Sequence, residues 1–252
     1  MTGPTLVLVH GAWHGARSWD PLLPFLGEEG LRTLAVQLPG VGRAPGRHDL
    51  AGHSAFLRAE LENLTGPLVV CGHSYGGAVV TQAVSGLDSG PGDGLGDGLG
   101  DGLGGRVRRL VYVAAFMLEV GESCVDAAVP APVPPEPHLT SVAEGDYLTV
   151  SEEAATHMFY GDCDPALARA AVASLTPEHL MTVGSPVTEA AWHTIPSTYV
   201  VCENDQALSP VAQARMAGRA TRTLSLDSSH SPMLSRPREL AAILAEAAGN
   251  GG

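Results

Sequence analysis

The sequence predicts an α/β fold in which a mainly parallel, doubly wound sheet is covered by helices on both faces. Six short apolar runs, each bounded by turn residues, recur at intervals that leave room for helices. The runs are continuous rather than alternating, which is typical of strands buried on both faces. Helical periodicity returns between them, as at Ala78, Val79 and Ala83. The predicted strands are Thr5–Val9, Thr33–Gln37, Leu68–Cys71, Val107–Val113, Thr198–Cys202 and Arg222–Leu226.

Length and composition fit one core domain with an insertion. A chain of 252 residues, 44% hydrophobic and 16% charged, is able to bury a large single core. We assign residues 1–115 and 197–252 to the core, and residues 116–196, a long gap between two predicted strands, to an inserted helical lid. Caps and prolines there predict helices at Ser151–Phe159, Pro165–Ser174 and Pro177–Val183.

Residues 89–105 interrupt the core with the sequence Asp-Gly-Leu-Gly, repeated three times in succession. This glycine content predicts a flexible surface loop, because burial of so few apolar groups does not offset the entropy lost on ordering. The recurring aspartates raise calcium binding as an alternative. However, the four-residue period differs from the nine-residue period of glycine-rich calcium-binding repeats.

The charge and cysteine content exclude several classes of function. Formal net charge is −13, and all 14 basic residues are arginines. Such a chain lacks the basic face that nucleic acids and anionic membranes require. The four cysteines show no metal-ligand spacing, and no apolar stretch approaches the ~20 residues of a membrane helix. We therefore expect a cytoplasmic protein without metal or organic cofactor and without nucleic-acid or membrane partners; its oligomeric state, a homodimer included, stays open.

The strongest chemical signal is the sequence Gly-His-Ser-Tyr-Gly at 72–76, between an apolar run and a helical pattern. In the G-x-S-x-G arrangement a serine lies on a tight strand-to-helix turn, and glycines flank it because side chains there would clash. The alternative is a glycine-rich turn that only connects two elements. Because both required flanks are present, we expect Ser74 to be a catalytic nucleophile.

A serine nucleophile needs a histidine base and a carboxylate that orients it. His230 follows the last predicted strand and precedes the C-terminal helix, so we expect it to be the base. His73, adjacent to the serine on a sharp turn, fits a structural role better. The acid is expected in the loop after the preceding strand, where we prefer Asp205 over Glu203. Asp227 is less suited because it lies close to His230 in sequence.

Acyl transfer also needs N–H donors for the oxyanion. One donor in this architecture is the residue after the nucleophile, here Tyr75, and the other comes from the loop after an early strand. The sequence His-Gly-Ala-Trp-His-Gly at 10–15 provides such a loop, which makes Ala12 the expected second donor. A simple strand-to-helix turn beside a core tryptophan is the alternative.

Motifs along nearly the whole chain recur together in one known group. They are HGAWHG at 10–15, GHSYGG at 72–77, VAAFM at 113–117, MFYG at 158–161, CEND at 202–205 and HSPM at 230–233. This combination resembles the plant methyl esterase and hydroxynitrile lyase branch of the α/β-hydrolase superfamily. The resemblance implies the α/β-hydrolase fold, a triad of Ser74, Asp205 and His230, and small carboxylic esters as substrates.

The esterases and the hydroxynitrile lyases of that branch differ at two sequence positions, and both positions can be identified in this chain. Its hydroxynitrile lyases carry a threonine in the first oxyanion loop and a lysine after the catalytic histidine. Here those places hold Gly11 or Ala12 and Ser231, and the chain contains no lysine. The resemblance therefore favours the esterase side.

We expect a serine hydrolase that cleaves a small ester or lactone through an acyl-enzyme. Two alternatives stay open: a lyase or biosynthetic tailoring enzyme that uses the same triad, and a receptor-like homologue that captures its ligand. Retention of all triad residues argues against the receptor. The expected pocket residues, for each of which a core position is the alternative, are Trp13, Phe116, Met117, Met158, Phe159 and Met233.

Overall fold

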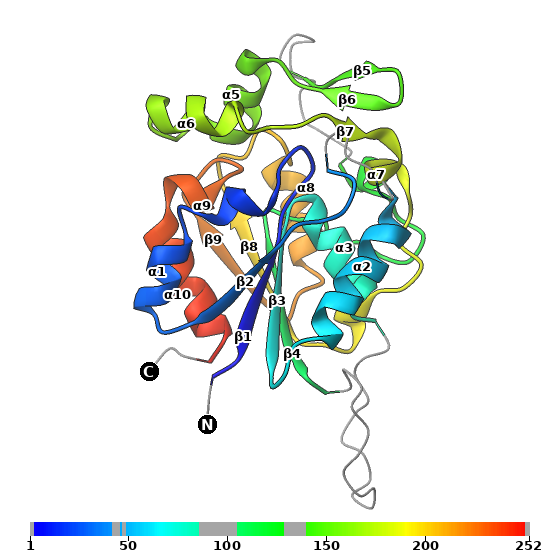
Figure 1. Ribbon diagram of the computed structural model, residues 1–252, viewed down its shortest axis with the longest axis vertical. Coiled ribbons are helices and arrows are strands. Elements are labelled where there is room, and N and C mark those ends of the chain that lie inside the picture. Colours follow the sequence, from blue (N-terminus) through cyan, green and yellow to red (C-terminus); the bar gives the residue numbers. More distant parts are fainter. Residues whose placement is uncertain (1–2, 42–45, 47–48, 86–104, 129–139, 250–252) are drawn as a thin grey trace, which may run out of the picture.

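The computed structural model describes residues 3–41, 46, 49–85, 105–128 and 140–249. Its centre is a six-stranded parallel sheet (Figure 1). The strands are β1 (Thr5–Val9), β2 (Arg32–Val36), β3 (Leu68–His73), β4 (Val107–Val113), β8 (Ser197–Cys202) and β9 (Arg222–Leu226). Each strand overlaps one of the six predicted runs, so the predicted parallel α/β fold is confirmed.

The order of the strands creates one crevice at the carboxyl edge of the sheet. The order is β2-β1-β3-β4-β8-β9, so the chain passes from β1 to β2 on one side and returns to β3 on the other. β1 and β3 pair in register from Thr5 opposite Leu68 to Val9 opposite Gly72. The loops that follow these adjacent strands diverge, and open parallel sheets bind ligands at such a point.

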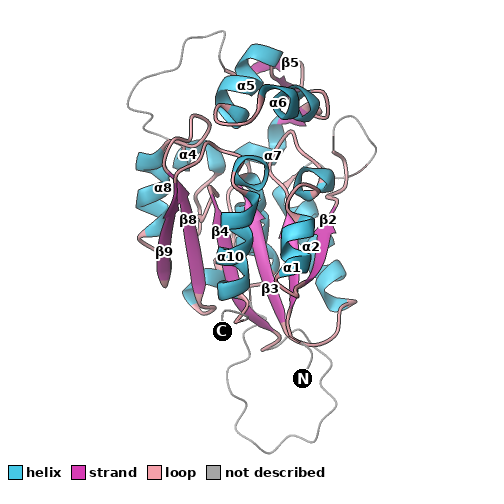
Figure 2. Ribbon diagram, turned by 90° about the vertical axis from the view of Figure 1, so that its left-hand side faces the viewer, coloured by secondary structure: helices cyan, strands magenta, loops and turns pink. Residues whose placement is uncertain are grey.

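Helices cover both faces of the sheet, as Figure 2 shows. They are η1 (Ala16–Trp19), α1 (Leu23–Glu28), α2 (Leu50–Glu62), α3 (Tyr75–Ala83), α4 (Cys124–Ala127), α8 (Pro210–Ala217), α9 (Pro232–Ser235) and α10 (Pro237–Ala247). Helices α2, α3 and α8 pack on one face, and α1, α9 and α10 pack on the other. This arrangement is the two-sided cover that continuous apolar strands require.

Alternate side chains of the central strands enter two separate cores. In β1, Val7 and Val9 join the core beneath α2 and α3, whereas Leu6 and Leu8 join the core beneath α1 and α10. All four side chains are inaccessible to solvent. Burying each one stabilises the fold by about 1.5–3 kcal/mol. The strand reads as one apolar run because neither of its faces meets water.

Residues 140–184 lie over the carboxyl edge of the sheet and are called the cap below (Figure 1). Their elements are β5 (Val142–Glu144), β6 (Tyr147–Thr149), α5 (Glu152–Tyr160), α6 (Pro165–Val172), β7 (Glu178–His179) and α7 (Leu180–Gly184). A further short helix, η3 (Ala191–His193), precedes β8. Ser151 and Asp164 cap α5 and α6 through their side chains, as the helix-start signals predict.

The cap differs from the prediction in one respect. Strands β5, β6 and β7 form a small antiparallel sheet. The predicted helix at Pro177–Val183 is therefore shorter, because Glu178 and His179 pair with β6 before α7 begins. The glycine-rich segment 89–105 and its calcium alternative lie outside the described residues, apart from Gly105.

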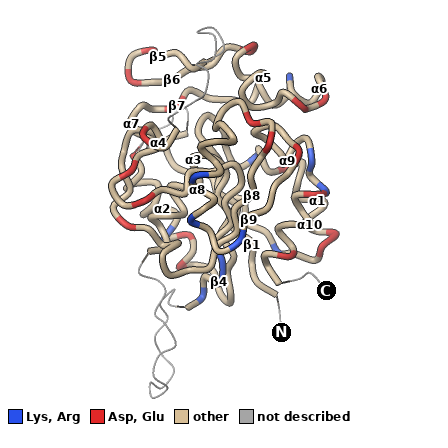
Figure 3. Tube along the Cα trace, turned by 180° about the vertical axis from the view of Figure 1, so that it is seen from behind, with Lys and Arg blue, Asp and Glu red and all other residues tan. Residues whose placement is uncertain are grey.

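Charged residues are dispersed over the surface of the described part of the chain. Figure 3 shows Asp and Glu positions along the cap and on both sides of the sheet, with arginines scattered among them. The acidic excess of the sequence is thus spread over many elements. None of the helices within the described ranges has the length and apolarity that crossing a membrane demands.

Candidate active site

Ser74 lies on the turn between β3 and α3. Its backbone has φ 52° and ψ −124°, a positive φ that residues with side chains rarely adopt. Such a conformation costs on the order of 1–3 kcal/mol and persists only where the surroundings impose it. The residue also caps the N-terminus of α3, where the field of the helix favours negative charge.

Close backbone packing explains the glycines around this turn. A side chain at Gly72 would place its Cβ atom 2.6 Å from backbone atoms of Gly76 and Gly77. One at Gly76 would collide with the carbonyl oxygens of Val9 and His10. The turn therefore rests directly on the end of β1, and no side chain separates the two backbones.

Backbone hydrogen bonds fix Ser74 to the next strand as well. Its N–H donates to the carbonyl oxygen of Val113, the last residue of β4, at 3.3 Å. Its carbonyl oxygen accepts the N–H groups of Gly77 and Phe116, each at 3.0 Å. These bonds hold the strained residue between β3, β4 and α3, which accounts for the persistence of the positive φ.

His230 and Asp205 meet at the same edge of the sheet. Asp205 follows β8, His230 follows β9, and the Nδ1 atom of the histidine lies 2.7 Å from Oδ2 of the carboxylate. Both side chains are almost completely buried. Because a carboxylate only accepts, Nδ1 of His230 carries a proton, and in the neutral ring the lone pair is left on Nε2.

Donors surround the carboxylate of Asp205. Its Oδ1 accepts the N–H groups of Ala207 at 2.8 Å and Leu208 at 2.9 Å. Its Oδ2 accepts Nε2 of Gln213 at 2.8 Å in addition to the imidazole. Gln213 is itself inaccessible and accepts the N–H of Cys202 in β8. No sequence signal marks Gln213, because its role depends on the packing of α8 beside β8.

The two alternative acids lie elsewhere. Glu203 is exposed, and Asp227 is exposed and accepts the side-chain N–H of Asn204 at 2.7 Å. Of the three carboxylates considered, Asp205 is the one hydrogen-bonded to His230.

His73 supports the backbone beneath His230. Its Nε2–H donates to the carbonyl oxygen of His230 at 2.8 Å, and the two rings lie 4.7 Å apart. Burial lowers the pKa of His73 well below its ordinary value, and the nearby rings of His230 and His14 lower it further. A neutral, buried imidazole bonded to a backbone oxygen fits the structural role expected for His73.

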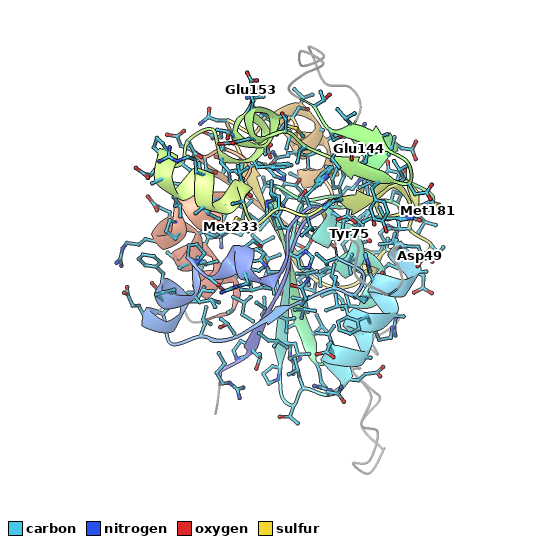
Figure 4. The ribbon with its side chains drawn as sticks, turned by 45° about the horizontal axis from the view of Figure 1, so that its top comes forward. Asp49, Tyr75, Glu144, Glu153, Met181 and Met233 are labelled. Carbon is cyan, nitrogen blue, oxygen red and sulfur yellow. The ribbon has the colours of Figure 1, made fainter. Side chains whose placement is uncertain are left out.

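A cavity of about 390 Å³ is lined by Ser74, by His230, by the two expected oxyanion donors and by four of the six expected pocket residues. Figure 4 shows Tyr75 beneath the cap, whose outer side carries Glu144 and Glu153. Apart from His230 and three hydroxyl residues, the described residues that line this cavity are apolar, and they include no Asp, Glu or Arg. They are Ala12, Trp13, Ser74, Tyr75, Phe116, Cys124, Val125, Ala128, Ser141, Leu148, Met158, Phe159, Val183, Ala207, Leu208 and His230.

Two of the predicted pocket residues lie in the cores instead. Met117 belongs to the core beneath α2 and α3, and Met233 belongs to the core beneath α1 and α10. Both side chains are almost inaccessible. Met117 follows the lining residue Phe116 and Met233 lies three residues after His230, but both flexible side chains pack between helix and sheet.

Residues 10–15, called the first loop below, follow β1 and touch the turn of Ser74. A side chain at Gly11 would place its Cβ atom 2.8 Å from Cβ of Ser74. The N–H groups of Ala12 and Tyr75, both lining the cavity, have no hydrogen-bond partner among the described residues. Two unpaired amides in a cavity that contains Ser74 are suited to receive a carbonyl oxygen.

Two histidines of this loop were not singled out from the sequence as site residues. His10 donates from Nδ1 to the carbonyl oxygen of Gly11 at 2.9 Å, and His14 donates to that of Ala12 at 2.7 Å. Burial lowers the pKa of each to about 4, so both rings are neutral at pH 7. No three His, Cys, Asp or Glu side chains in the described ranges are grouped to hold a metal ion.

Comparisons with known proteins show which sequences and folds this chain is similar to. The chain is 28% identical to the alpha/beta hydrolase nvfD of Aspergillus novofumigatus, over 99% of this chain and 98% of that one. It is 25% identical to Methylesterase 2 of Arabidopsis thaliana, over 97% and 95%. A solved pyrethroid hydrolase from Sphingobium faniae JZ-2 has a TM-score of 0.77 at 24% identity, covering 98% and 97%.

These relatives confirm the resemblance to plant methylesterases that the motifs indicated. A profile described as "Alpha/beta hydrolase family" matches residues 6–243, which include the turn of Ser74, the cap and His230. The chain therefore belongs to the alpha/beta hydrolase family.

Proposed function

We propose that this α/β hydrolase cleaves small, neutral carboxylic esters or lactones with Ser74 as nucleophile. The observation that carries the proposal is one cavity lined by Ser74 on its strained turn and by His230, which Asp205 holds in one tautomer. A serine hydroxyl is a poor nucleophile at neutral pH unless a base accepts its proton. The lone pair on Nε2 of His230 supplies that base.

The acylation step follows from these positions. The Ser74 Oγ atom attacks the carbonyl carbon while its proton passes to Nε2 of His230. The negative charge that develops on the carbonyl oxygen is stabilised by the N–H groups of Ala12 and Tyr75. When the tetrahedral intermediate collapses, the bond to the alcohol oxygen breaks and His230 returns the proton to that oxygen.

Deacylation repeats the chemistry with water. His230 takes a proton from a water molecule, and the resulting nucleophile attacks the acyl carbonyl of the Ser74 ester. Collapse of the second intermediate breaks the bond to Ser74 Oγ, which regains its proton from His230. In both steps Asp205 stabilises the imidazolium and keeps Nε2 directed at the reacting atoms.

The cavity wall supports a neutral substrate with apolar groups. No Asp, Glu or Arg is among the described lining residues, so a charged acyl or alcohol group would lose its hydration without a permanently charged partner. The cap supplies Leu148, Met158, Phe159 and Val183 to that wall. We propose that it acts as a lid that selects substrates. The names methylesterase and pyrethroid hydrolase among similar proteins support a carboxylic ester.

Covalent labelling with a fluorophosphonate probe tests the proposal. Wild type is expected to gain one adduct at Ser74, detected by peptide mass spectrometry, and Ser74→Ala is expected to gain none. A panel of methyl and p-nitrophenyl esters of increasing acyl length then defines the substrate range. Absence of labelling and of ester hydrolysis in folded wild type would refute the proposed chemistry.

A further inference from the structure

The peptide group between Ala12 and Trp13 is held at both of its ends. Its carbonyl oxygen, on Ala12, accepts Nδ1 of His14 at 2.7 Å. Its N–H, on Trp13, donates to Oε2 of Glu178 at 3.0 Å. A planar peptide bonded on both sides cannot rotate freely about the neighbouring single bonds. The residue that carries the proposed oxyanion donor is therefore fixed at its C-terminal side.

Both groups that hold this peptide are connected to the cap. His14 is buried, and its Nε2 atom pairs at 2.8 Å with the hydroxyl of Tyr160, the last residue of α5. Because Nδ1 donates to a carbonyl oxygen and the ring is neutral, Nε2 accepts a hydrogen bond from the Tyr160 hydroxyl. Glu178 is the first residue of β7 and is 8% exposed. Strand β7 of the cap thus bonds this peptide directly, and helix α5 is connected to it through His14.

Trp13 has further bonds to the cap and a strained backbone. Its carbonyl oxygen accepts the N–H of Thr176 at 2.9 Å, and its indole N–H donates to the carbonyl oxygen of Leu148 at 3.1 Å. Its φ is 62°, a region that residues with side chains rarely occupy. Such a conformation persists where surrounding contacts impose it, and here most of those contacts come from the cap.

The preceding peptide is held from the other side. Its carbonyl oxygen, on Gly11, accepts Nδ1 of His10, and its N–H is the unpaired donor of Ala12. In a trans peptide the C=O and N–H groups point in opposite directions. The direction of the Ala12 N–H thus depends on two consecutive peptides, one held within the first loop by His10 and one held by His14 and Glu178.

We propose that Glu178 and His14 are positioning residues that keep the Ala12 N–H aimed at the reacting carbonyl oxygen, so that the cap forms part of the oxyanion site. This inference rests on the proposed serine hydrolase function. Neither side chain is among the described residues that line the cavity, so both act through the backbone of Ala12 and Trp13. Loss of either contact weakens transition-state stabilisation more than substrate binding.

Substitutions at Glu178 separate hydrogen bonding from packing. Glu178→Gln keeps a side-chain oxygen that accepts the Trp13 N–H, whereas Glu178→Met fills similar space without an acceptor. Loss of one oxyanion donor costs about 10²–10³ in kcat, so a misdirected donor is expected to cost about 10-fold to 100-fold in Glu178→Met. KM is expected to stay within about 3-fold, and Glu178→Gln is expected to keep kcat within about 5-fold. Glu144→Gln, an exposed glutamate on β5, is the matched control.

The inhibition constant of a trifluoromethyl ketone distinguishes loss of oxyanion stabilisation from a general loss of packing. The Ser74 Oγ atom adds to the carbonyl carbon of this ketone, the serine proton passes to His230, and the carbonyl oxygen becomes a hemiketal oxyanion, whereas the matching methyl ketone remains a ground-state ligand. The inhibition constant of the trifluoromethyl ketone is expected to rise in parallel with the loss of kcat/KM, with the affinity for the methyl ketone nearly unchanged. Tyr160→Phe removes a single hydroxyl and is expected to show the same pattern at about 3-fold to 10-fold.

The outcomes distinguish this inference from the proposed function. Wild type that forms no trifluoromethyl ketone adduct would refute the serine chemistry and the positioning role with it. A reactive wild type with unchanged kcat in Glu178→Met, or in Tyr160→Phe where Glu178→Met does not fold, would refute the positioning role alone. Equal weakening of both ketones, with a lowered melting temperature, would also refute it.

Discussion

The turn of Ser74 and the first loop contribute equivalent parts to one site, yet they are held in different ways. The Ser74 turn is fixed by backbone packing, with Gly72 and Gly76 in contact with neighbouring main chain. The first loop is fixed by side chains, because His10, His14 and Glu178 bond its peptide groups. Both regions include a residue with positive φ.

Because the two regions are held differently, they should be sensitive to different kinds of substitution. The backbone-to-backbone contacts of Gly72 and Gly76 are sensitive to added volume and contain no titrating group. Peptides held by neutral imidazoles and a carboxylate respond to protonation and to loss of single polar atoms. The predictions below vary volume, charge and hydrogen bonding in turn to test that distinction.

Removal of the base sets the scale for all other effects. His230→Gln leaves both regions in place but removes the group that accepts the serine proton, so kcat/KM is expected to fall about 10⁴-fold. Steady-state ester hydrolysis measures the change. His157→Gln, on α5 and not among the described lining residues, is the control and should retain wild-type activity. A loss of only a few-fold in His230→Gln would show that another group is the base.

Added volume is expected to break the Ser74 turn. In Gly76→Ala the new Cβ atom meets the carbonyl oxygens of Val9 and His10, which are main-chain atoms that cannot rotate away. The free energy of unfolding should fall by on the order of 3 kcal/mol, measured by urea denaturation. Gly27→Ala in α1, where nothing lies within 4 Å, should instead raise it by about 0.4–1 kcal/mol. Equal effects at the two positions would contradict the packing argument.

Acid is expected to act on the first loop. The pKa values of His10 and His14 are lowered to about 4 by burial, whereas unfolded histidine titrates near 6.5. Between these values the unfolded chain binds more protons, so this contribution to stability is complete above pH ~6.5 and is lost as pH falls toward 4. Melting temperatures from pH 7.5 to 4.5 measure the loss. His14→Asn removes one titrating group, and a slope identical to that of wild type would contradict the assignment.

The smallest effect is expected at the hydroxyl of Tyr75. This group bonds Nδ1 of His53 at 2.8 Å, but the Tyr75 N–H is directed by the turn of Ser74 and not by the side chain. Tyr75→Phe should therefore lower kcat by less than about 3-fold while destabilising the fold by about 1–3 kcal/mol, because the buried hydrogen bond between the two side chains is lost. A loss of kcat as large as in Glu178→Met would mean that both regions depend on side chains.

The core was predictable because its signals are local. The central strands β1, β3 and β4 carry long apolar runs, and Ser74, Asp205 and His230 were selected because each comes after a predicted strand. Parallel strands bring their carboxyl ends to one edge, so position after a strand was enough to predict that these residues meet.

The cap and the groups that hold the first loop were not predictable in the same way. Strands β5 and β6 are three residues each and lie partly or fully exposed, so they carry no continuous apolar signal. Glu178 contacts a peptide 165 residues away in the sequence, and His14 contacts Tyr160 at a separation of 146. Such partners are set by the docking of the cap, which no local pattern encodes.

The surroundings of Asp205 limit what can replace it. Four N–H donors converge on this carboxylate, from His230, Gln213, Ala207 and Leu208. An asparagine of the same size would turn its NH₂ group toward two of them, and hydrogens would face hydrogens. With the NH₂ group in the place of Oδ2, facing His230 and Gln213, relief would require the imidazole to adopt its other tautomer, with a proton on the nitrogen that should receive one. Asp205→Asn would therefore disturb two groups at once. It would move the proton of His230 to the other ring nitrogen, and it would displace the Gln213 amide that accepts the Cys202 N–H in β8.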